Sequence, residues 1–429
     1  QIDSRFEAQA HGQEHYLEIV RALDCIPLAI ELAAARIRLL SVQQIARRLS
    51  QRFALLKSRE TDRPERHITL HGAIDWSWQL LGEEEKNVLA QASIFRGGFT
   101  IEAAEAVLTE NASTWILDTL QTLVDKSLLR SIPSGAHRRF TFFESIHHFV
   151  SAQLDDPGVL QRHKNYYLTL AEHLASEREG PNGVQANQQL TSEMENLLHV
   201  ARTEPGEATA RVALLLDPIF EEQGPRSTHM ALINAALQHD EPLSIAQRMT
   251  LRFAKARLQR DSPDIMPADE DPLKDVSHLA AQSGDPALIA RAVLYEIEAR
   301  VLPDGDIQRA RTLAEAHKET LLTHGSTQDR FQLYQTLGRI AEHQTRWAEA
   351  ETLTRKALAI AQSQQKLRWE ARCLQFLGLT LCNAGQTEEA EEVLRHAIDM
   401  HKHFGARQSA ANCLGILAEL LLFREAHDT

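Results

Sequence analysis

Apolar residues recur every three or four positions along most of this chain, the spacing that places side chains on one face of an α-helix. After Pro27, the residues Leu28, Leu32, Ala35 and Leu39 follow one another at steps of four, three and four. Proline is tolerated in a first helical turn because the amide hydrogens there have no intrahelical partner. The pattern therefore predicts a buried amphipathic helix that begins at Pro27.

The helical pattern continues to about residue 126 and then changes to short runs of β-type residues. Ser41 and Gln44 predict a capping box. Trp76 shares the inward stripe of a helix predicted over 69–81. Further helices are predicted directly after residues 82, 100 and 113, and strands at 128–132 and 138–143 flank a predicted turn at 133–136. Helices followed by a hairpin predict a winged helix.

A Leu-Gly pair recurs in the last third of the chain at steps of 40 and 37 residues: Leu337-Gly338, Leu377-Gly378 and Leu414-Gly415. The first two glycines are each followed, twelve residues later, by an alanine, Ala350 and Ala390. Small residues at these positions let two antiparallel helices cross closely. The segments WAEAETLTRKALAIA and TEEAEEVLRHAIDM resemble second helices of tetratricopeptide repeats. Because the period exceeds the ~34 residues usual for that family, we expect longer turns between the helices.

The segment DCIPLAIELAAAR, at residues 24–36, resembles the GLPLA segment of the NB-ARC module of STAND signal-transduction ATPases. The segments TLHGAIDWSWQLL, FRGGFTIEAAEAVL, LVDKSLLR and RRFTFFESIHHFV resemble, in the same order, the winged-helix domain that follows this module in bacterial STAND proteins. The resemblance covers about residues 20–155. It implies that Pro27 packs against an adenine ring, with Leu28 as its neighbour.

The chain contains no Gly-Lys dipeptide, and therefore no G-x-x-x-x-G-K-[ST] loop to hold phosphates. We therefore expect that this chain is not an enzyme by itself. ADP or ATP with magnesium is expected only together with an upstream nucleotide-binding domain. The resemblance places the family's nucleotide-sensing motif at Phe142-Phe143-Glu144, where some relatives carry a histidine. Phe143 cannot donate a hydrogen bond, and His147 and His148 would be poor substitutes.

Together these patterns predict a mainly α protein: a helical subdomain and a winged helix with a small β-hairpin wing, followed by an α-solenoid of tetratricopeptide-like helical hairpins. The predicted domains are a partial NB-ARC-type helical subdomain (1–66), a winged-helix domain (67–155), a helical connector (156–285) and tetratricopeptide-like repeats (286–429). The chain starts without methionine and its last repeat lacks part of a second helix, so we expect it to be part of a longer protein.

Composition narrows the function classes. With a formal net charge of -13 over 429 residues, nonspecific binding of DNA or anionic membranes by the whole chain is disfavoured. No apolar run reaches the ~18–20 residues of a membrane helix. No H-E-x-x-H metal motif or G-x-S-x-G hydrolase motif is present. The four cysteines stand singly, which predicts buried thiols in a reducing compartment, the cytoplasm: Cys25, Cys373, Cys382 and Cys413.

The first helix of each repeat pair is expected to line the concave surface of the solenoid. Its polar stripe predicts a groove for a protein or peptide ligand, formed by Gln335, Arg339, Glu342, Arg372, Gln375, Asn383 and Asn412. Amides combined with forked arginine donors suit a peptide backbone and one or two carboxylates. The alternative is that these residues form only a solvated surface.

These expectations favour a regulatory protein whose repeats receive a signal and whose winged helix passes it to an upstream nucleotide switch. One alternative is a transcription regulator that binds DNA through the winged helix. The helix before the wing carries Asp118 and Asp125 and only Lys126 as a cation, so DNA binding through this segment is disfavoured. Another alternative is an interaction scaffold without a nucleotide role.

Overall fold

The computed structural model divides the chain into two units, residues 1–166 and residues 167–429. The structure describes residues 16–17, 19–20, 41–47, 70–79, 81–109, 115–134, 137–239, 243–261, 273–298 and 306–428. Pro27, Leu28 and Cys25 lie outside the described residues, as do Ser113 and the side chain of Trp76. The predictions made for those positions stay predictions.

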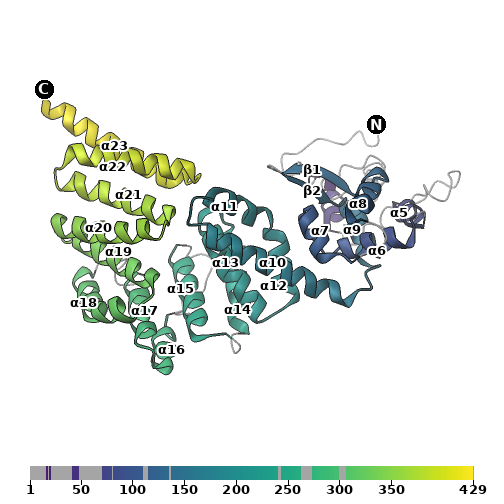
Figure 1. Cartoon of the computed structure of the whole chain (residues 1–429), viewed down its shortest axis with the longest axis horizontal. Helices are drawn as coiled ribbons and strands as arrows, with labels where there is room; N and C mark the ends of the chain where they lie inside the picture. Colours follow the sequence, from purple (N-terminus) through teal and green to yellow (C-terminus); the bar gives the residue numbers. More distant parts are fainter. Residues whose placement is uncertain are drawn as a thin grey trace. The chain divides into compact units, whose positions relative to one another are not determined.

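The described part of the first unit is a group of helices with one hairpin (Figure 1). Its elements are α3 (Val42–Arg47), α5 (Leu70–Gln79), α6 (Glu83–Ala92), α7 (Ile101–Val107), α8 (Ile116–Asp125), β1 (Arg130–Ser134), β2 (His137–Thr141) and α9 (Glu144–Ser151). Helices α6, α7 and α8 followed by the hairpin have the order of a winged helix, as predicted. The predicted capping box of α3 is also confirmed, since the backbone amide of Gln44 donates to Ser41 Oγ at 3.2 Å.

A glycine turn connects α6 to the wing. Gly97 and Gly98 have φ of 70° and 90°, in the left-handed region that side chains disfavour. A Cβ at Gly98 would also lie 2.7 Å from the Phe140 carbonyl oxygen. The turn lets Phe99 pair with Phe140 as an isolated bridge, with the two rings 5.6 Å apart. Phe95 stacks on Phe99 at 4.3 Å, so aromatic rings fill the space between helix and wing.

The hairpin is tighter than the sequence predicts. Pro133 pairs with Arg138 and Ser134 with His137, so only positions 135–136 lie between the strands. The prediction of a turn over 133–136 was therefore wrong by two residues. Proline is tolerated here because β1 is an edge strand of the two-stranded sheet.

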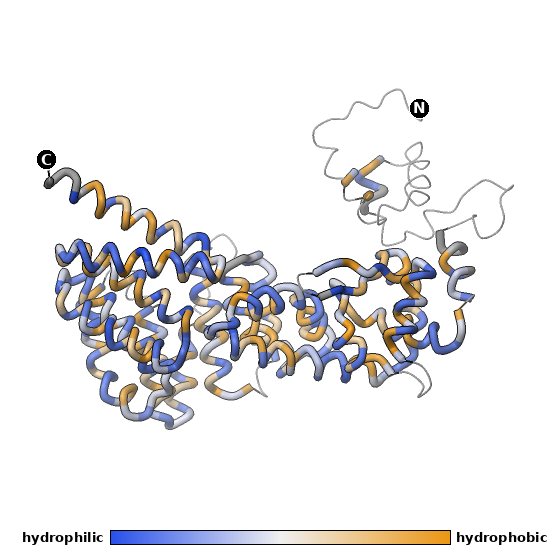
Figure 2. The backbone as a smooth tube through the Cα atoms, turned by 45° about the horizontal axis from the view of Figure 1, so that its top comes forward, coloured by the Kyte–Doolittle hydropathy of each residue, from blue (hydrophilic) through white to orange (hydrophobic). Residues whose placement is uncertain are grey.

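The second unit is a succession of helical hairpins (Figure 1), and the division between the units falls within α10 (Pro157–Glu177). Its further helices are α11 (Gly183–Ser192), α12 (Met194–Thr203), α13 (Glu207–Gln223), α14 (Arg226–Gln238), α15 (Ile245–Asp261), α16 (Val276–Ser283), α17 (Pro286–Glu296), α18 (Ile307–His324), α19 (Thr327–His343), α20 (Trp347–Ser363), α21 (Leu367–Asn383), α22 (Thr387–His403) and α23 (Arg407–Asp428). Hydrophobic and hydrophilic residues alternate along these helices, as expected for helices that bury one face (Figure 2). The chain is thus mainly helical with one small hairpin, as predicted.

The 40-residue period of the repeats comes from long helices. Helices α19, α20, α21 and α22 each have 17 residues. Three residues separate each from the next, at 344–346, 364–366, 384–386 and 404–406. The middle residue of each turn is left-handed, with φ of 56°, 53°, 78° and 68° at Thr345, Gln365, Gly385 and Gly405. The expectation of longer turns was wrong, because the extra length lies in the helices.

Two of the predicted small residues, Ala350 and Ala390, have no exposed surface, and neither have Ala357 and Ala397 seven residues farther on. Gly415 is an exception to the pattern, because a Cβ there would meet nothing within 4 Å. A Cβ at Gly378 would come within 2.6 Å of the Leu394 side chain, so glycine sets how closely α21 and α22 approach. The sequence pattern therefore marks the contacts that hold each hairpin together.

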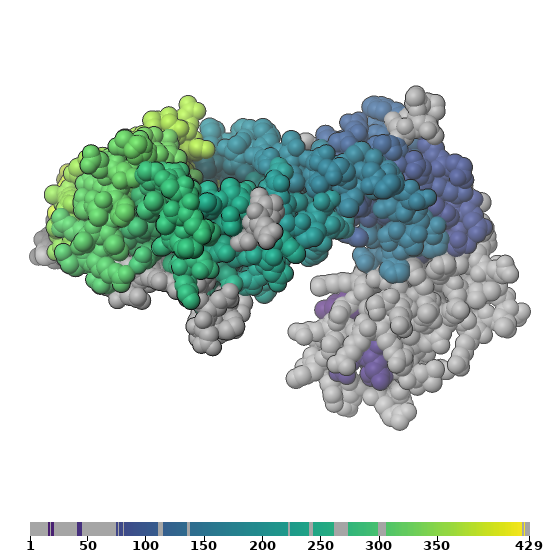
Figure 3. Space-filling model, turned by 90° about the horizontal axis from the view of Figure 1, so that it is seen from below, coloured from purple at the N-terminus to yellow at the C-terminus, as the bar shows by residue number. Residues whose placement is uncertain are grey.

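Stacked hairpins begin earlier in the sequence than the Leu-Gly pattern. Helix α13 packs on α14, and α15 packs on both α14 and α16. The first helix of each hairpin also contacts the first helix of the next, from α13 to α15, α15 to α17 and α17 to α19. The colours of this unit change in sequence order across its surface (Figure 3). The segment predicted as a connector thus contains hairpins that continue into the repeats.

Candidate functional site

The first helices of the hairpins lie side by side and form one continuous wall, which we call the inner wall: α13, α15, α17, α19 and α21. Residues about 40 positions apart in the sequence contact each other between neighbouring helices of this wall. The pairs in contact are Asp217 with Arg257, Arg291 with Asp329, Phe331 with Trp369 and Gln335 with Cys373. A side chain on one helix therefore meets its counterpart one repeat later.

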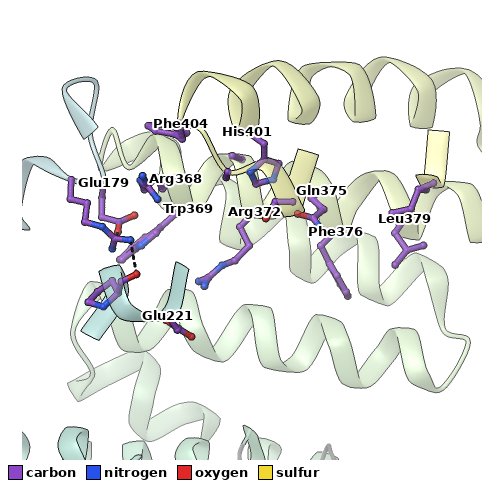
Figure 4. A pocket seen from close by; sticks show the side chains of 16 residues that line it. Glu179, Glu221, Arg368, Trp369, Arg372, Gln375, Phe376, Leu379, His401 and Phe404 are labelled. Carbon is purple, nitrogen blue, oxygen red and sulfur yellow. Dashed lines mark hydrogen bonds and ion pairs between the residues drawn. The ribbon is translucent and has the colours of Figure 1, made fainter. Parts of the chain in front are cut away.

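Two cavities open on the inner wall. The larger, of about 660 Å³, extends from Asp217 on α13 to Arg372 on α21. The smaller, of about 440 Å³, lies between α21, the turn before α23 and the segment that follows α10 (Figure 4). Both cavities are lined by Arg178, Pro218, Glu221, Trp369, Arg372 and Phe376. We call the two together the inner cavity.

The wall at α13 and α15 carries a cluster of charges. Arg257 Nη2 donates to both carboxylate oxygens of Asp217 at 2.9 Å, and its Nε lies 3.2 Å from Glu221 Oε1. The fully buried His229 places Nε2 3.1 Å from Asp217 Oδ1. Burial raises the pKa of Asp217, but the neighbouring His229 and Arg257 outweigh it and hold that pKa below its usual range. One arginine thus serves two carboxylates.

Arg257 contacts Glu221 less closely than it contacts Asp217. Burial raises the pKa of Glu221, and the nearby Asp217 carboxylate raises it further, against the opposing charge of Arg257. The same two carboxylates raise the pKa of Arg257. Glu221 is therefore the carboxyl group of this cluster that most readily takes up a proton.

A second ion pair joins α17 to α19. Arg291 donates from Nε and Nη2 to the two carboxylate oxygens of Asp329, each at 2.7 Å. Asp329 also accepts from the Ser326 amide at 2.9 Å and from its hydroxyl at 2.8 Å, as part of the capping box of α19. Burial raises the pKa of Asp329, but these hydrogen bonds and the Arg291 charge lower it overall. One carboxylate therefore both caps α19 and fixes it against α17.

Aromatic pairs alternate with these charges along the wall. Phe253 stacks on Tyr295 with ring centres 4.1 Å apart, and Phe331 stacks on Trp369 at 4.3 Å. The Arg372 guanidinium lies over the Phe331 ring, 5.3 Å from its centre. All four rings line the larger cavity; Phe253, Tyr295 and Trp369 are partly buried, while Phe331 is only 1% exposed. The inner cavity is thus bounded by flat rings as well as by charges.

The predicted groove residues divide into two sets. Gln335, Arg339 and Arg372 line the larger cavity, and Gln375 lines the smaller one together with Arg372. In Figure 4, Arg372 points into the open space between Trp369 and Glu221.

Among the described residues, the cavity lining does not include Glu342, Asn383 or Asn412. Glu342 lies on α19, where burial raises its pKa, and Asn383 is the last residue of α21. The exposed Asn412 accepts a hydrogen bond from Gln408 on α23 at 3.3 Å. The structure therefore places Asn383 and Asn412 outside the cavity that the arginines line, while Glu342 lies outside the lining but near enough to Arg339 that this charge opposes the rise in its pKa.

Sequence reasoning missed the part of the site contributed by α13, α15 and α17. The missed residues are Asp217, Glu221, Arg257, Arg291 and Tyr295. Opposite charges at a separation of about 40 residues, as at Asp217 and Arg257, were the available signal. That signal becomes visible only once the hairpin period is extended upstream of residue 286.

In the first unit, the position of the predicted nucleotide-sensing motif is described. Phe143 is the N-cap of α9, and the Arg130 guanidinium lies 4.4 Å from its ring centre. His147 is buried, with its ring nitrogens within 3.0 Å of Arg96 Nη1 and Nε2 2.9 Å from the Ser93 carbonyl oxygen. Burial and the Arg96 charge lower the His147 pKa. His147 is thus committed to contacts inside the winged helix.

None of the His, Cys, Asp and Glu side chains in the described ranges form a group that could hold a metal ion. The described helices also include none with the length and apolar character needed to cross a membrane.

Comparisons with known proteins agree with the repeat architecture. Residues 329–403, which span most of α19 to α22, match the family model described as tetratricopeptide repeat. The chain is 30% identical over 312 residues to proteins named "Putative HTH-type transcriptional regulator" in Mycobacterium bovis and Mycobacterium tuberculosis. Each of these matches covers 68% of this chain and 35% of the relative, so the chain spans about a third of their length.

Two further similarities were found. An uncharacterized protein of Mycobacterium tuberculosis is 32% identical over 156 residues, which is 35% of this chain and 40% of that protein. The crystal structure of a STAND protein with a tetratricopeptide repeat sensor from Pyrococcus horikoshii matches with a TM-score of 0.44 and 14% identity. That match covers 91% of this chain and 62% of the other.

Proposed function

We propose that this chain is the sensing and coupling part of a signalling regulator, in which the inner wall of the repeats receives a ligand or partner. The observation that carries the proposal is the charge balance of the larger cavity. Its lining contains six arginines and four carboxylates: Arg178, Arg257, Arg260, Arg291, Arg339 and Arg372, with Asp217, Glu221, Glu298 and Asp329.

Two of these arginines are available to a ligand. Arg257 and Arg291 hold three of the carboxylates in ion pairs. Across the described residues, neither Arg339 nor Arg372 has a carboxylate within ion-pair distance. Both arginines are exposed on the inner wall of a chain whose formal net charge is -13, and their charges oppose the rise in the pKa of Glu342 and Glu221 from beyond ion-pair distance. Arginine at such a site favours carboxylate or phosphate ligands, because its planar fork matches their geometry.

The coupling part of the proposal concerns the first unit. We infer that its winged helix passes the signal to a nucleotide-binding domain outside this chain, with Pro27 and Leu28 contributing adenine contact. The chain itself would then have no ATPase activity. The resemblance of residues 20–155 to STAND modules supports this inference, together with the regulatory names of the relatives. The engagement of His147 with Arg96 and Ser93 argues against a direct phosphate contact from that histidine.

DNA binding through the winged helix is the second candidate function, favoured by the relatives' names. The surface of α8 opposes it: Asp118, Gln121 and Asp125 are exposed, while Lys126 donates to Glu85 at 2.7 Å. The wing arginines are also engaged within the chain. Arg130 lies over Phe143, Arg138 donates to Ser131 Oγ, and Arg139 donates to the Gly98 carbonyl oxygen. Arg130 and Arg138 are exposed and contact neutral groups, so this face offers phosphates the charge of two arginines beside the carboxylates of α8.

The proposal is tested by replacing both available arginines. The double variant Arg339→Ala with Arg372→Ala should lose binding to a panel of acidic peptides measured by fluorescence polarisation, while its melting temperature stays within a few degrees of wild type. Arg395→Ala is the matched control, because Arg395 is 60% exposed on α22 and pairs with Glu391 within its own helix. Equal binding by the folded double variant and the control would remove the inner wall as the sensing surface.

A further inference from the structure

We propose that the inner cavity binds a small organic anion with a flat ring, such as an aromatic phosphate or carboxylate. This inference rests on the proposed function, since it names the class of ligand that the same inner wall would receive. It follows from three properties of the cavity: the position of its free charge, the nature of its walls and its size.

Free charge and flat rings meet at one place on α21. Arg372 lines both cavities and has no carboxylate within ion-pair distance among the residues described. Its guanidinium lies over the Phe331 ring, and that ring stacks on Trp369. Phe376 contributes another ring to both cavities one helical turn along α21. Because Phe331 is only 1% exposed, the ring surface left for a group attached to the anion is that of Trp369 and Phe376. A flat ring packs better there than a flexible chain.

Positive charge continues along the wall on α19. Arg339 lies eight residues beyond Phe331, and so ~12 Å farther along the helix. Arg372 and Arg339 thus mark two ends of a site longer than one phosphate group. Between them, Gln335 donates a weak hydrogen bond to Cys373 Sγ at 3.6 Å, which a stronger acceptor would replace.

The cavity has the dimensions of a small-molecule site. Its two parts measure about 660 and 440 Å³, within the ~300–1,000 Å³ range of ligand pockets. It is also closed on one side, because the segment after α10 contacts the start of α21. The Arg368 amide lies 3.4 Å from the Glu179 carbonyl oxygen, and Arg178 Nη2 lies 3.5 Å from the Pro218 carbonyl oxygen (Figure 4). This closure limits the room for an extended peptide along the whole inner wall.

The test uses isothermal titration calorimetry on the 429-residue chain with defined probes. Two probes combine a ring with an anion: 1-naphthyl phosphate and 1-naphthoate. Two anions lack the ring, inorganic phosphate and citrate. One probe, 1-naphthalenemethanol, has the ring but no charge. We expect both ring-bearing anions to bind at least about tenfold more tightly than the other three. Comparing the phosphate with the carboxylate then identifies the preferred anion.

Variants assign the binding to Arg372 and its rings. Arg372→Gln should weaken 1-naphthyl phosphate binding roughly 10- to 100-fold, the usual cost of losing hydrogen bonds to a charged group. Arg372→Lys, which keeps the charge but not the fork, should fall in between. Trp369→Leu should reduce the preference over inorganic phosphate by about three- to tenfold. Arg395→Gln, on the outer surface, should bind like wild type.

The outcomes separate this inference from the proposed function. Binding that survives unchanged in Arg372→Gln, or inorganic phosphate binding as tightly as 1-naphthyl phosphate, would overturn the assignment of a ring-bearing anion. If only acidic peptides bind, and the double variant Arg339→Ala with Arg372→Ala abolishes that binding, the ring-bearing anion is refuted as the ligand. The proposal that the inner wall is the sensing surface is then supported. If neither kind of ligand binds, both proposals fail. Should Arg372→Gln not fold, Arg372→Lys carries the same comparison.

Discussion

Asp329 offers the sharpest test of how the inner wall is held together. It is 5% exposed, it completes the capping box of α19 with Ser326, and it forms a two-point ion pair with Arg291 on α17. Replacing it with alanine removes the cap and leaves Arg291, whose side chain is 23% exposed, without its carboxylate.

The magnitude follows from these two losses. Removing a helix cap costs about 1 kcal/mol. Breaking a buried ion pair costs about 3–5 kcal/mol, and less where the remaining charge reaches water, as Arg291 does. We therefore expect Asp329→Ala to lower the free energy of unfolding by roughly 3–4 kcal/mol, measured by urea titration followed by circular dichroism. Ser326→Ala, which removes the cap but keeps the ion pair, should cost only about 1 kcal/mol.

Asp329 also predicts a pH dependence of stability. Because the native pKa of Asp329 is lowered from 3.8, its stabilisation is fully present above that value and disappears as the pH falls through the native pKa. The difference between wild type and Asp329→Asn should therefore shrink in acid. If Asp329→Ala costs no more than Ser326→Ala at neutral pH, the ion pair adds nothing to the wall and the reasoning is refuted.

Three further outcomes are expected. A Cβ added at Gly378 would lie 2.6 Å from Leu394, whereas one added at Gly415 would meet nothing within 4 Å. Urea titration should therefore show Gly378→Ala to be less stable than Gly415→Ala by about 1–3 kcal/mol. Equal free energies of unfolding for the two variants would contradict the close helix crossing. Glu221→Gln should raise the free energy of unfolding at neutral pH, because a carboxyl group whose pKa is raised in the folded chain destabilises it once ionised. This gain should vanish below pH 4.5, where the group is protonated in both states. A lower free energy of unfolding at neutral pH would show that the ion pair with Arg257 dominates. The purified chain should show no ATP turnover and little ADP binding by calorimetry, and hydrolysis that persists through further purification would sink the nucleotide assignment.

The repeats and the wing were predictable because their signals are local. Small residues at fixed spacing mark helix crossings, and these gave α19 to α22 directly. Turn lengths were not predictable, since Thr345 and Gln365 adopt the left-handed conformation without the glycine that usually announces it. The residues beyond the usual repeat length lie in the helices, and hydrophobic periodicity alone does not show where a helix ends.

The upstream half of the site was hidden for a different reason. Helices α13 and α15 have no Leu-Gly pair, and the contact between them on the inner wall is charged. Asp217 and Arg257 look like ordinary surface residues in a hydrophobicity pattern, and only the fold shows that they face each other. Arg339 and Arg372 were found from the sequence because they stand on helices whose repeat pattern is clear. Glu342, Asn383 and Asn412 were grouped with them by the same periodicity, although the cavity extends toward α13 rather than along their stripe.

The order of charges along the inner wall suggests why the available arginines matter. Arg257 binds Asp217 between α15 and α13, and Arg291 binds Asp329 between α17 and α19, so ion pairs join these two pairs of neighbouring helices, whereas Phe253 stacks on Tyr295 between α15 and α17. Between α19 and α21 no such pair is found in the described residues, and Arg372 rests on Phe331 instead. A bound anion would supply the missing negative charge at this joint. Ligand binding would then stabilise the second unit by about 2.7 kcal/mol at a hundredfold excess over Kd, acting at a joint where Phe331 stacks on Trp369 and Gln335 donates to Cys373.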